Sequence, residues 1–309
     1  MAEFSAKDVA ELRKQTGCGM MDCKNALKEA DGDFEAAIKY LREKGIASAA
    51  KKQSRIAAEG LVDVMTIDGV TVMTEVNSET DFVAKNEAFK EFVKGILRTI
   101  AANRPADVDA LLTCKFDGTD NTVSEVLTEK TFTIGEKLSI RRFVIVDGVV
   151  STYIHGMGAT GVIISFDVDA AAAATAEFAE LAKNVALQTA AMPSLYVDKA
   201  SVPASVIEEE KAILAKQMEN DPKFAGKPAK VIDGIITGKL GKYYENNCLL
   251  EQAYVKDDSM TVGKYVASVA KALGTDITVK AFYRYDKGEG IQKREENFAE
   301  EIAKAINKN

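Results

Sequence analysis

One part of this chain repeats another, and this internal duplication constrains the fold more than any other feature. FKEFVKGILRTIAA (89–102) aligns without gaps with FAELAKNVALQTAA (178–191), a shift of 89 positions. The apolar residues of both stretches recur at the spacing of one face of a helix. The alignment therefore predicts that one helix of the fold occurs twice.

Two further matches follow in the same order along the chain. LLTCKF (111–116) matches LLEQAY (249–254) at a shift of 138, and IGEKLSIRRF (134–143) matches LGTDITVKAF (273–282) at 139. Each match is weak by itself, but the shared order predicts two copies of one structural unit. Because 138 − 89 leaves about 49 positions, the second copy carries an insertion of that size.

Each unit is expected to combine strands with helices. LVDVMTIDGVTVMTEVN, starting at Leu61, alternates apolar and polar residues around Asp68-Gly69, a dipeptide typical of tight hairpin turns. An amphipathic helix and a shorter helical stretch follow, and LSIRRFVIV (138–146) predicts a third strand. The fold class is therefore α+β, with a duplicated core of antiparallel sheets.

The first 45 residues predict three short helices instead. The first ends near Gly17, the second is broken by Asp31-Gly32-Asp33, and the third begins after Asp33 and closes at Gly45. So small a unit has a marginal core, and we expect it to depend on a partner or on the rest of the chain. Residues 46–59 are interpreted as a connector, helical in part.

The insertion and the C-terminal end are also expected to be helical. Residues 203–220 and 228–244 each carry an apolar stripe that includes Ile213 in the first helix, and they predict an antiparallel helical hairpin over 203–245. NFAEEIAKAI (297–306) predicts an amphipathic helix near the C-terminal end.

These elements predict four parts. They are an N-terminal three-helix domain with its linker (1–55), a first core repeat (56–148), a second core repeat that contains the hairpin (149–289), and a C-terminal helical module (290–309). An apolar sheet face in either repeat can serve the other repeat or a second copy of the chain, so self-association stays open.

Composition disfavours catalysis. The chain has one histidine, His155, and four cysteines that form no paired CxxC elements, so neither a catalytic triad nor a zinc site is expected. No glycine-rich loop has the pattern that cradles phosphates, so neither type of phosphate-binding loop is supported. With a formal net charge of −7, direct binding to nucleic acid is also disfavoured. A binding protein is favoured over an enzyme.

Neither a targeting segment nor a membrane-spanning segment is expected from the sequence. Its first residues, MAEFSAKDVAELRKQTG, lack the apolar core of a signal peptide, and nowhere do 18 apolar residues run together. We therefore expect no membrane association and a cytoplasmic location, with the four cysteines reduced.

One segment, NSETDFVAKN (77–86), combines turn residues with apolar ones. Thr80 and Asp81 suit a turn or a helix start, whereas Phe82 and Val83 are apolar where loops are usually polar. Phe82 either folds back onto the core or projects as an anchor for a partner. Burial of its ring in a partner would stabilise the complex by roughly 1.5–3 kcal/mol. The sequence leaves both interpretations open.

Two stretches resemble the signatures of the bacterial-type translation elongation factor Ts family. They are LRKQTGCGMMDCKNALKEADGDFEAAIKYLREKG (12–45) and TDFVAKN (80–86), and the duplicated unit, the helical hairpin and GEGIQK (288–293) agree with them. The resemblance implies a protein without a catalytic centre or cofactor that binds elongation factor Tu and releases its GDP. It also implies that the first 45 residues are a ubiquitin-associated-like domain.

The resemblance further implies the positions that touch the partner. Asp81 and Phe82 would wedge beside the magnesium site of elongation factor Tu, with Thr80 and Val83 next to them. The other implied contacts are Arg13, Met20, Met21, Ile134, Gly135 and His155. Ala159 and Thr160 depart from the family, which commonly has a basic and then an aliphatic residue there.

Two other classes of function stay open on the sequence alone. A three-helix domain of this type also suits an adaptor for polyubiquitin or nucleic acid, in which KKQSR (51–55) would provide positive charge. An enzyme of unknown type would need a cleft of titratable groups. The exchange-factor interpretation is the one that accounts for both signatures.

Overall fold

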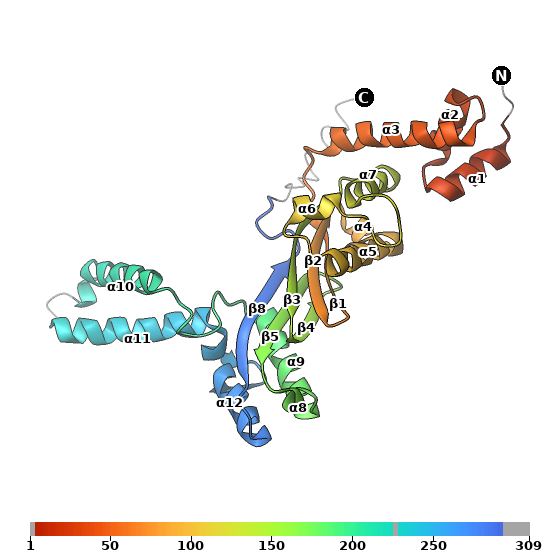
Figure 1. Ribbon diagram of the computed structural model, residues 1–309. Helices are drawn as coiled ribbons and strands as arrows, with labels where there is room; N and C mark the ends of the chain where they lie inside the picture. The colour runs from red at the N-terminus through yellow and green to blue at the C-terminus, as the bar shows by residue number, and fades with distance from the viewer. Residues whose placement is uncertain (1–3, 225–227, 293–309) are drawn as a thin grey trace.

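The computed structural model describes residues 4–224 and 228–292, and these form two packed sheets with helical extensions on both sides (Figure 1). The fold is mixed α and β with small antiparallel sheets, as the sequence predicts. The division into domains at the boundaries given above stays a prediction. The expected helix at 297–306 lies outside the described residues.

The N-terminal helices form a separate small core. Their bounds are α1 Ala6–Thr16, α2 Met20–Glu29 and α3 Phe34–Lys52. Leu12, Cys23, Leu27 and Leu41 are buried among them, and Phe132 of helix α7 (Val123–Ile134) completes the cluster. The unit therefore leans on the rest of the chain, as its size requires.

The predicted end of the third helix at Gly45 is wrong. Helix α3 continues to Lys52, because the residues after Gly45 are helix formers such as Ala and Lys. Gly45 is buried, and a Cβ added there would lie 3.5 Å from the Cβ of Phe132. The glycine therefore marks a close approach of α3 to α7, and only residues 53–58 connect α3 to the first strand.

The first repeat has the predicted strand pair, helices and third strand. Its elements are β1 Glu59–Ile67, β2 Val70–Ser78, α4 Asp81–Lys85, α5 Glu87–Asn103, α6 Val108–Thr113, α7 and β3 Ser139–Asp147. The sheet order is β1-β2-β3, and every pair is antiparallel. Asp68 and Gly69 both have positive φ, 50° and 82°, as the predicted hairpin turn requires.

The second repeat follows the same plan at the predicted shift. Its elements are β4 Val149–His155, β5 Thr160–Asp167, α8 Ala170–Ala173, α9 Ala176–Ala191, the 3₁₀ turn η2 Leu249–Glu251, the strands β6 Ala253–Tyr254 and β7 Asp257–Thr261, α12 Val262–Leu273 and β8 Thr278–Asp286. The sheet order β4-β5-β8 repeats the order of the first sheet. Helices α5 and α9 begin 89 positions apart, and α7 and α12 begin 139 apart.

The two sheets pack face to face. Val62, Met73, Val146 and Ile163 are buried between them, whereas neighbouring residues of the same strands face α5 or α9. This is the consequence of strand geometry, in which successive side chains point to opposite faces. Each repeat therefore covers the inner sheet face of the other. These two apolar faces thus pack within the chain and are not available to a second copy.

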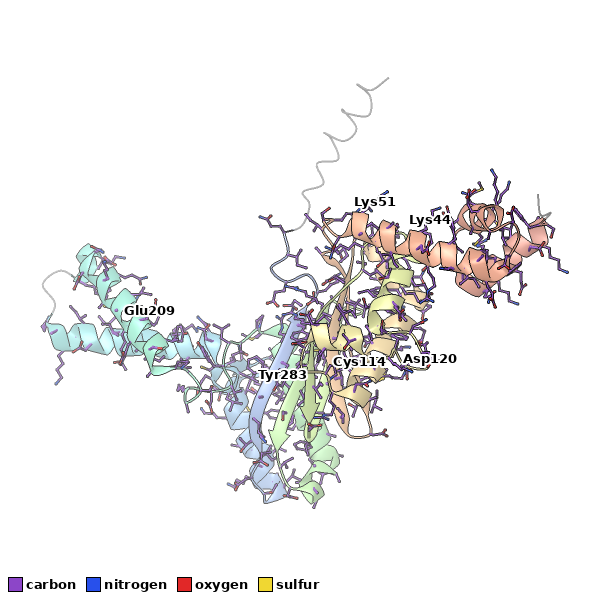
Figure 2. All side chains as sticks on the ribbon, turned by 45° about the horizontal axis from the view of Figure 1, so that its top comes forward. Lys44, Lys51, Cys114, Asp120, Glu209 and Tyr283 are labelled. Atoms are coloured by element: carbon purple, nitrogen blue, oxygen red, sulfur yellow. The ribbon has the colours of Figure 1, made fainter. Side chains whose placement is uncertain are left out.

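The insertion is a helical hairpin, α10 Ala204–Glu219 and α11 Ala229–Asn247, with the short 3₁₀ turn η1 Pro222–Phe224 after α10. Figure 2 shows this arm, which carries Glu209, projecting from one side of the sheets, and α3, which carries Lys44 and Lys51, from the other. Leu214 and Met218, four residues apart, are buried in α10. Ile213, which the sequence places on the apolar stripe, is instead 45% exposed. The buried face of α10 is therefore narrower than the sequence predicts.

None of the helices in the described part of the chain is both long and apolar enough to cross a membrane.

Candidate partner-binding site

Helix α4, a single turn between β2 and α5, holds Asp81, Phe82 and Val83, with Thr80 as its N-cap residue. The Ser78 hydroxyl donates to the Thr80 carbonyl at 2.9 Å, which turns the chain out of β2. Val83 packs against the core of the first repeat. Val83, one of the two apolar residues in the middle of α4, thus anchors this turn on the core.

Phe82, the other central apolar residue, projects into solvent with 79% of its surface exposed. The interpretation in which it folds back onto the core is therefore wrong for this structure. The Lys85 ammonium lies 5.8 Å from the centroid of the Phe82 ring, within the range of a cation–π contact. An exposed phenyl ring on a fixed turn is a surface that a partner can bury.

Asp81 pairs with the same lysine. Its carboxylate accepts from the Lys85 Nζ at 2.5 Å, one helical turn away, and this hydrogen bond lowers the pKa of Asp81 below its ordinary value. Asp81 is therefore ionised at neutral pH. Because both side chains are about half exposed, solvent screens the pair and a new partner can compete for either charge.

Ile134 and Gly135 end α7 and lie close to this turn. Ile134 packs against the same core as Val83, and Gly135 closes the helix with φ of 87°, a left-handed conformation that suits glycine. The next residue, Glu136, is bonded to Thr80 and to its neighbour Glu79. The structure thus brings 134–136 and 79–83 together, although they are far apart in the sequence.

Glu136 is a residue that sequence reasoning missed. One carboxylate oxygen accepts from the backbone N–H groups of Glu79 and Thr80 at 3.1 and 2.9 Å, and the other accepts from the Thr80 hydroxyl at 2.6 Å. The Glu79 carboxylate in turn accepts hydrogen bonds from the Lys137 backbone N–H at 2.6 Å and from the Arg55 guanidinium at 3.2 Å. The only sequence signal was its place directly after the helix-ending Gly135, which is a poor guide to a contact 56 residues away.

His155 is the last residue of β4 and is exposed. Its Nδ1 lies 3.0 Å from the hydroxyl of Tyr153, and the two rings are tilted with centroids 6.0 Å apart. The turn that follows rests on β1, because the Gly158 carbonyl accepts from the Val62 N–H at 2.8 Å. Helix α4 also packs against β1, so this turn and α4 lie at the same end of the sheets (Figure 1).

Met157, at the tip of that turn, was not predicted as a site residue. It is 87% exposed and has a φ of 55°, a conformation that is unfavourable for a side chain of this kind. Ala159 and Thr160 follow in the turn and the strand, and Lys287 donates its N–H to the Ala159 carbonyl. An exposed methionine therefore stands at the tip of the turn between β4 and β5.

Arg13, Met20 and Met21 lie on a second surface, on the N-terminal helices. Met20 and Met21 are 45% and 63% exposed, whereas Cys23 and Leu27 on the other face of α2 are buried. The Arg13 side chain makes no hydrogen bond or ion pair within residues 4–224 and 228–292. In Figure 1, α1 and α2 stand at the end of α3 that is remote from the sheets, so the structure does not bring these residues together with Phe82.

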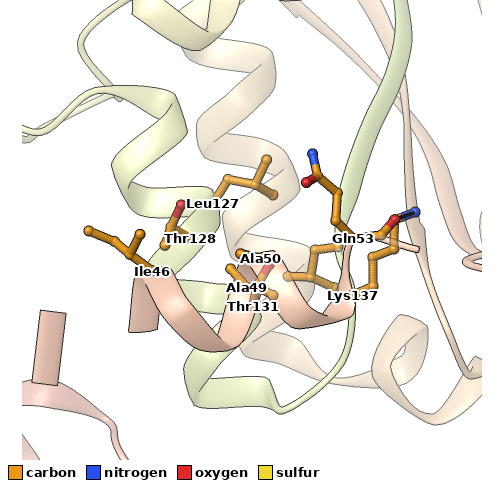
Figure 3. A pocket seen from close by; sticks show the side chains of 9 residues that line it. Ile46, Ala49, Ala50, Gln53, Leu127, Thr128, Thr131 and Lys137 are labelled. Carbon is orange, nitrogen blue, oxygen red and sulfur yellow. Dashed lines mark hydrogen bonds between the residues drawn. The ribbon is translucent and has the colours of Figure 1, made fainter. Parts of the chain in front are cut away.

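A hollow of about 240 Å³ lies between α3 and α7 (Figure 3). Small and apolar side chains such as Ala49, Ala50 and Leu127 line most of it, and Lys137 at its edge is engaged by the carbonyls of Gln53 and Arg55. No acidic side chain lines it. It has the character of a packing gap between helices rather than of a substrate cleft.

The described residues contain no group of three or more His, Cys, Asp or Glu side chains placed to hold a metal ion. All four cysteines are free, and burial raises the pKa of the Cys248 thiol to about 11, so this thiol is protonated at neutral pH. The features that stand out at the surface are therefore apolar side chains on fixed turns.

Comparisons with known proteins agree on one family. The family described as Elongation factor TS matches residues 79–289. A protein named Elongation factor Ts from Clostridioides difficile is 48% identical over 310 residues, which cover 99% of this chain and 100% of that protein. Proteins of the same name from Syntrophotalea carbinolica and Clostridium botulinum are 44% and 43% identical, and each alignment covers at least 97% of both chains.

Proposed function

The chain belongs to the elongation factor Ts family, and we propose that it binds elongation factor Tu and promotes the release of GDP during translation elongation. Family membership makes it a translation elongation factor of the nucleotide-exchange type. The observation that carries the finer proposal is Phe82, which is 79% exposed on a turn fixed from several sides. Such a side chain is already in place for a partner, so little order has to be gained on binding.

The proposed mechanism is a coupling between two ligands of elongation factor Tu. If the factor and GDP each bind it and each weakens the other, the weakening is equal in both directions. Every tenfold loosening of GDP requires about 1.4 kcal/mol of differential binding. Burial of the Phe82 ring in a partner that has shifted its helices supplies roughly 1.5–3 kcal/mol, which suffices for a substantial part of the effect.

Asp81 adds an electrostatic contribution in this proposal. Its carboxylate is ionised and stands beside Phe82, so it enters the same part of the partner. Near a bound magnesium ion, it would rearrange the groups and water that hold the metal on the phosphates. Loss of the metal leaves phosphate charge uncompensated and speeds the departure of GDP.

The remaining predicted contacts extend the surface. Ile134 and Gly135 lie close to α4, His155 lies at the same end of the sheets, and Arg13, Met20 and Met21 offer a second patch on the N-terminal helices. Two adjacent exposed methionines suit an adaptable apolar contact. The factor acts in this proposal through contacts, with no catalytic residue or cofactor of its own, and a cytoplasmic location stays a prediction.

The adaptor class is the alternative that the experiment must separate. KKQSR (51–55) carries the charge that this alternative needs, but Lys52 is buried with its Nζ on the Thr131 carbonyl, and Arg55 is paired with Glu79. Two of the three cationic residues in this segment, Lys52 and Arg55, are thus used within the chain. This observation favours the exchange factor.

The test is to mix the protein with elongation factor Tu loaded with a fluorescent GDP and to follow its release after adding excess unlabelled GDP. We expect release to accelerate with factor concentration and then to saturate. The Phe82→Ala and Asp81→Ala variants are expected to accelerate it far less. If the intact chain leaves the release rate unchanged, the exchange function is wrong. If the intact chain accelerates release and both variants accelerate it equally well, the wedge assignment is wrong and the exchange function stands.

A further inference from the structure

We propose that Glu136 is the positioning residue of this site: it clamps the start of α4 and thereby fixes Asp81 and Phe82 in the orientation used for exchange. The inference rests on the proposed function, which it deepens. Glu136 touches neither the Phe82 ring nor the Asp81 carboxylate through any hydrogen bond in the described structure. Its influence passes through the backbone of Glu79 and Thr80.

The geometry of the clamp supports this role. Both carboxylate oxygens of Glu136 are used, one by two backbone N–H groups and the other by the Thr80 hydroxyl. Bonds to a charged acceptor are roughly twice as strong as neutral ones. Three of them on two consecutive residues fix the direction in which the chain leaves β2, and α4 begins at the very next residue, Asp81.

The N-cap of α4 shows what the clamp replaces. A threonine in this position usually accepts from the helix N–H groups, but the Thr80 side chain makes no such bond and instead donates to Glu136. The first turn of α4 is therefore held by a residue from the loop after α7. Because Gly135 ends α7 immediately before Glu136, the long helix α7 serves as the rigid support of the clamp.

The second repeat contains one of these three bonds, the side-chain bond, with donor and acceptor exchanged. Thr275, which stands 139 positions after Glu136, donates its hydroxyl to Asp169, which stands 89 positions after Thr80, at 2.5 Å. Asp169 also caps its own helix α8 by accepting from the Ala172 N–H. The connection is thus part of the shared architecture, but in the second repeat it holds a helix of four alanines with no side chain to position.

This pair provides a matched control for the experiment. Removing Glu136 frees the turn that carries Phe82, whereas removing Thr275 breaks the equivalent bond in the repeat that carries alanine there. We expect Glu136→Ala to lower the rate of GDP release at saturating factor by about tenfold, which corresponds to about 1.4 kcal/mol. We expect Thr275→Ala to change it less than about twofold, or about 0.4 kcal/mol.

Glu136→Gln is the conservative variant that should restore function. The amide oxygen can accept from both backbone N–H groups, and the amide nitrogen can donate to the Thr80 hydroxyl, which also accepts. The geometry of the clamp survives although the charge is lost. We therefore expect Glu136→Gln to release GDP within about threefold of the intact chain, a loss of about 0.7 kcal/mol.

A double-mutant cycle with Phe82→Ala separates positioning from a general loss of structure. If Glu136 acts through α4, Glu136→Ala has little further effect once Phe82 is absent. The same tenfold loss in both backgrounds would overturn the proposal, as would an intact rate for Glu136→Ala alone. Thermal unfolding of each variant checks that it is folded. If Glu136→Ala does not fold, Thr80→Val tests the same clamp, because it removes only the hydrogen bond from the Thr80 hydroxyl. An intact chain that fails to release GDP overturns the proposed function instead.

Discussion

The two repeats have one backbone plan, yet the candidate site belongs mainly to one of them. In both, a hairpin leads to a one-turn helix, then to a long helix that covers the sheet, and finally to a third strand. The one-turn helix reads DFVAK in the first repeat and AAAA in the second. Figure 1 shows α4 and α8 at opposite ends of the packed sheets.

The repeats also differ in what they bury. In the first sheet Glu75 pairs with Arg142 just before a bulge, and in the second Ser165 pairs with Ala281 at the corresponding place. Glu75 is fully buried and accepts from Arg141, Arg142, Asn77 and the Gly288 N–H, so it ties the first sheet to the loop after β8. The second repeat carries the helical arm α10–α11 instead.

The two repeats show that the backbone plan does not by itself specify the side chains of the candidate site. Apolar periodicity, turns and caps build the frame, and they are present in both copies. Asp81 and Phe82 are present in one copy only, on a turn whose backbone the other copy also has. Fold alone would therefore not locate the site, because each end of the molecule offers the same turn.

The largest expected effect tests whether the two cores are equivalent. Phe89 and Phe178 occupy matching positions on α5 and α9 and are 0% and 3% exposed. Each change to alanine should lower the free energy of unfolding by about 3–5 kcal/mol, because it removes a buried ring and leaves a cavity. Urea unfolding followed by circular dichroism measures both, with Phe82→Ala as an exposed control expected within about 0.5 kcal/mol.

A loss confined to one of the two core variants would show that the repeats do not share the stability of the fold equally.

The next effect concerns the charge that only the first repeat buries. Burial alone would raise the pKa of Glu75, but hydrogen bonds from Gly288, Asn77 and the two arginines outweigh burial and lower it below 4.5. Glu75→Gln should cost about 3 kcal/mol at pH 7, because it leaves buried partners of a charge uncompensated. Urea unfolding of both proteins measures the difference.

The pH dependence of that difference has a definite sign. A carboxyl whose pKa is lower in the folded state stabilises the fold at pH values above its unfolded pKa, and the stabilisation is lost as the pH falls through the folded value. The advantage of the intact chain over Glu75→Gln should thus be constant from pH 7 to 5 and shrink below 4.5. An advantage that grows on acidification would contradict the assignment, and Ser165→Ala should show no such dependence.

A smaller effect compares the two hairpin turns. Met157 and Asp68 both have positive φ, 55° and 50°, but aspartate tolerates this conformation far better than methionine does. Met157→Gly should therefore raise the free energy of unfolding by about 0.5–1 kcal/mol, and Asp68→Gly should leave it nearly unchanged. Thermal unfolding of the two variants under one condition measures the contrast, and equal shifts would remove strain as the explanation.

The smallest expected effect asks whether an aromatic ring on the wrong turn is enough. Ala171 is exposed on α8 at the position that corresponds to Phe82 on α4. Ala171→Phe should change stability by no more than about 0.5 kcal/mol, and it should not restore GDP release to the Phe82→Ala variant. Restored release in that double variant would mean that either end of the molecule can act, and that the asymmetry of the repeats is not functional.

Much of the fold could be predicted because it depends on local signals. The Asp68-Gly69 dipeptide indicates its hairpin through backbone conformation alone, and the match of 89–102 to 178–191 indicates the duplication before any contact is known. Gly45 misled the prediction, since a glycine near the end of a helical pattern resembles a C-cap. Whether it ends a helix or admits a neighbour was decided by Phe132, 87 residues away.

The candidate site was predicted less completely, and for the same reason. The TDFVAKN motif pointed to Asp81 and Phe82, but not to the outcome that Val83 packs against the core while Phe82 is exposed. Glu136 acts through partners 56 and 57 residues away, and every partner of Glu75 named here except Asn77 lies 66 to 213 residues away, so no local pattern marks either residue. Met157 had no signal at all, because its exposure and its φ are properties of the folded turn.

The sequence by itself determined the kinds and order of the elements, the repeat, the family and the scarcity of catalytic groups, because periodicity, caps, turns and composition are written in consecutive residues. Only the tertiary structure decided which sheet faces cover each other, which of two neighbouring apolar residues faces the partner, and which carboxylates hold the turn. Those outcomes depend on packing and hydrogen bonds between distant segments, where two side chains compete for one space and only the folded chain selects between them.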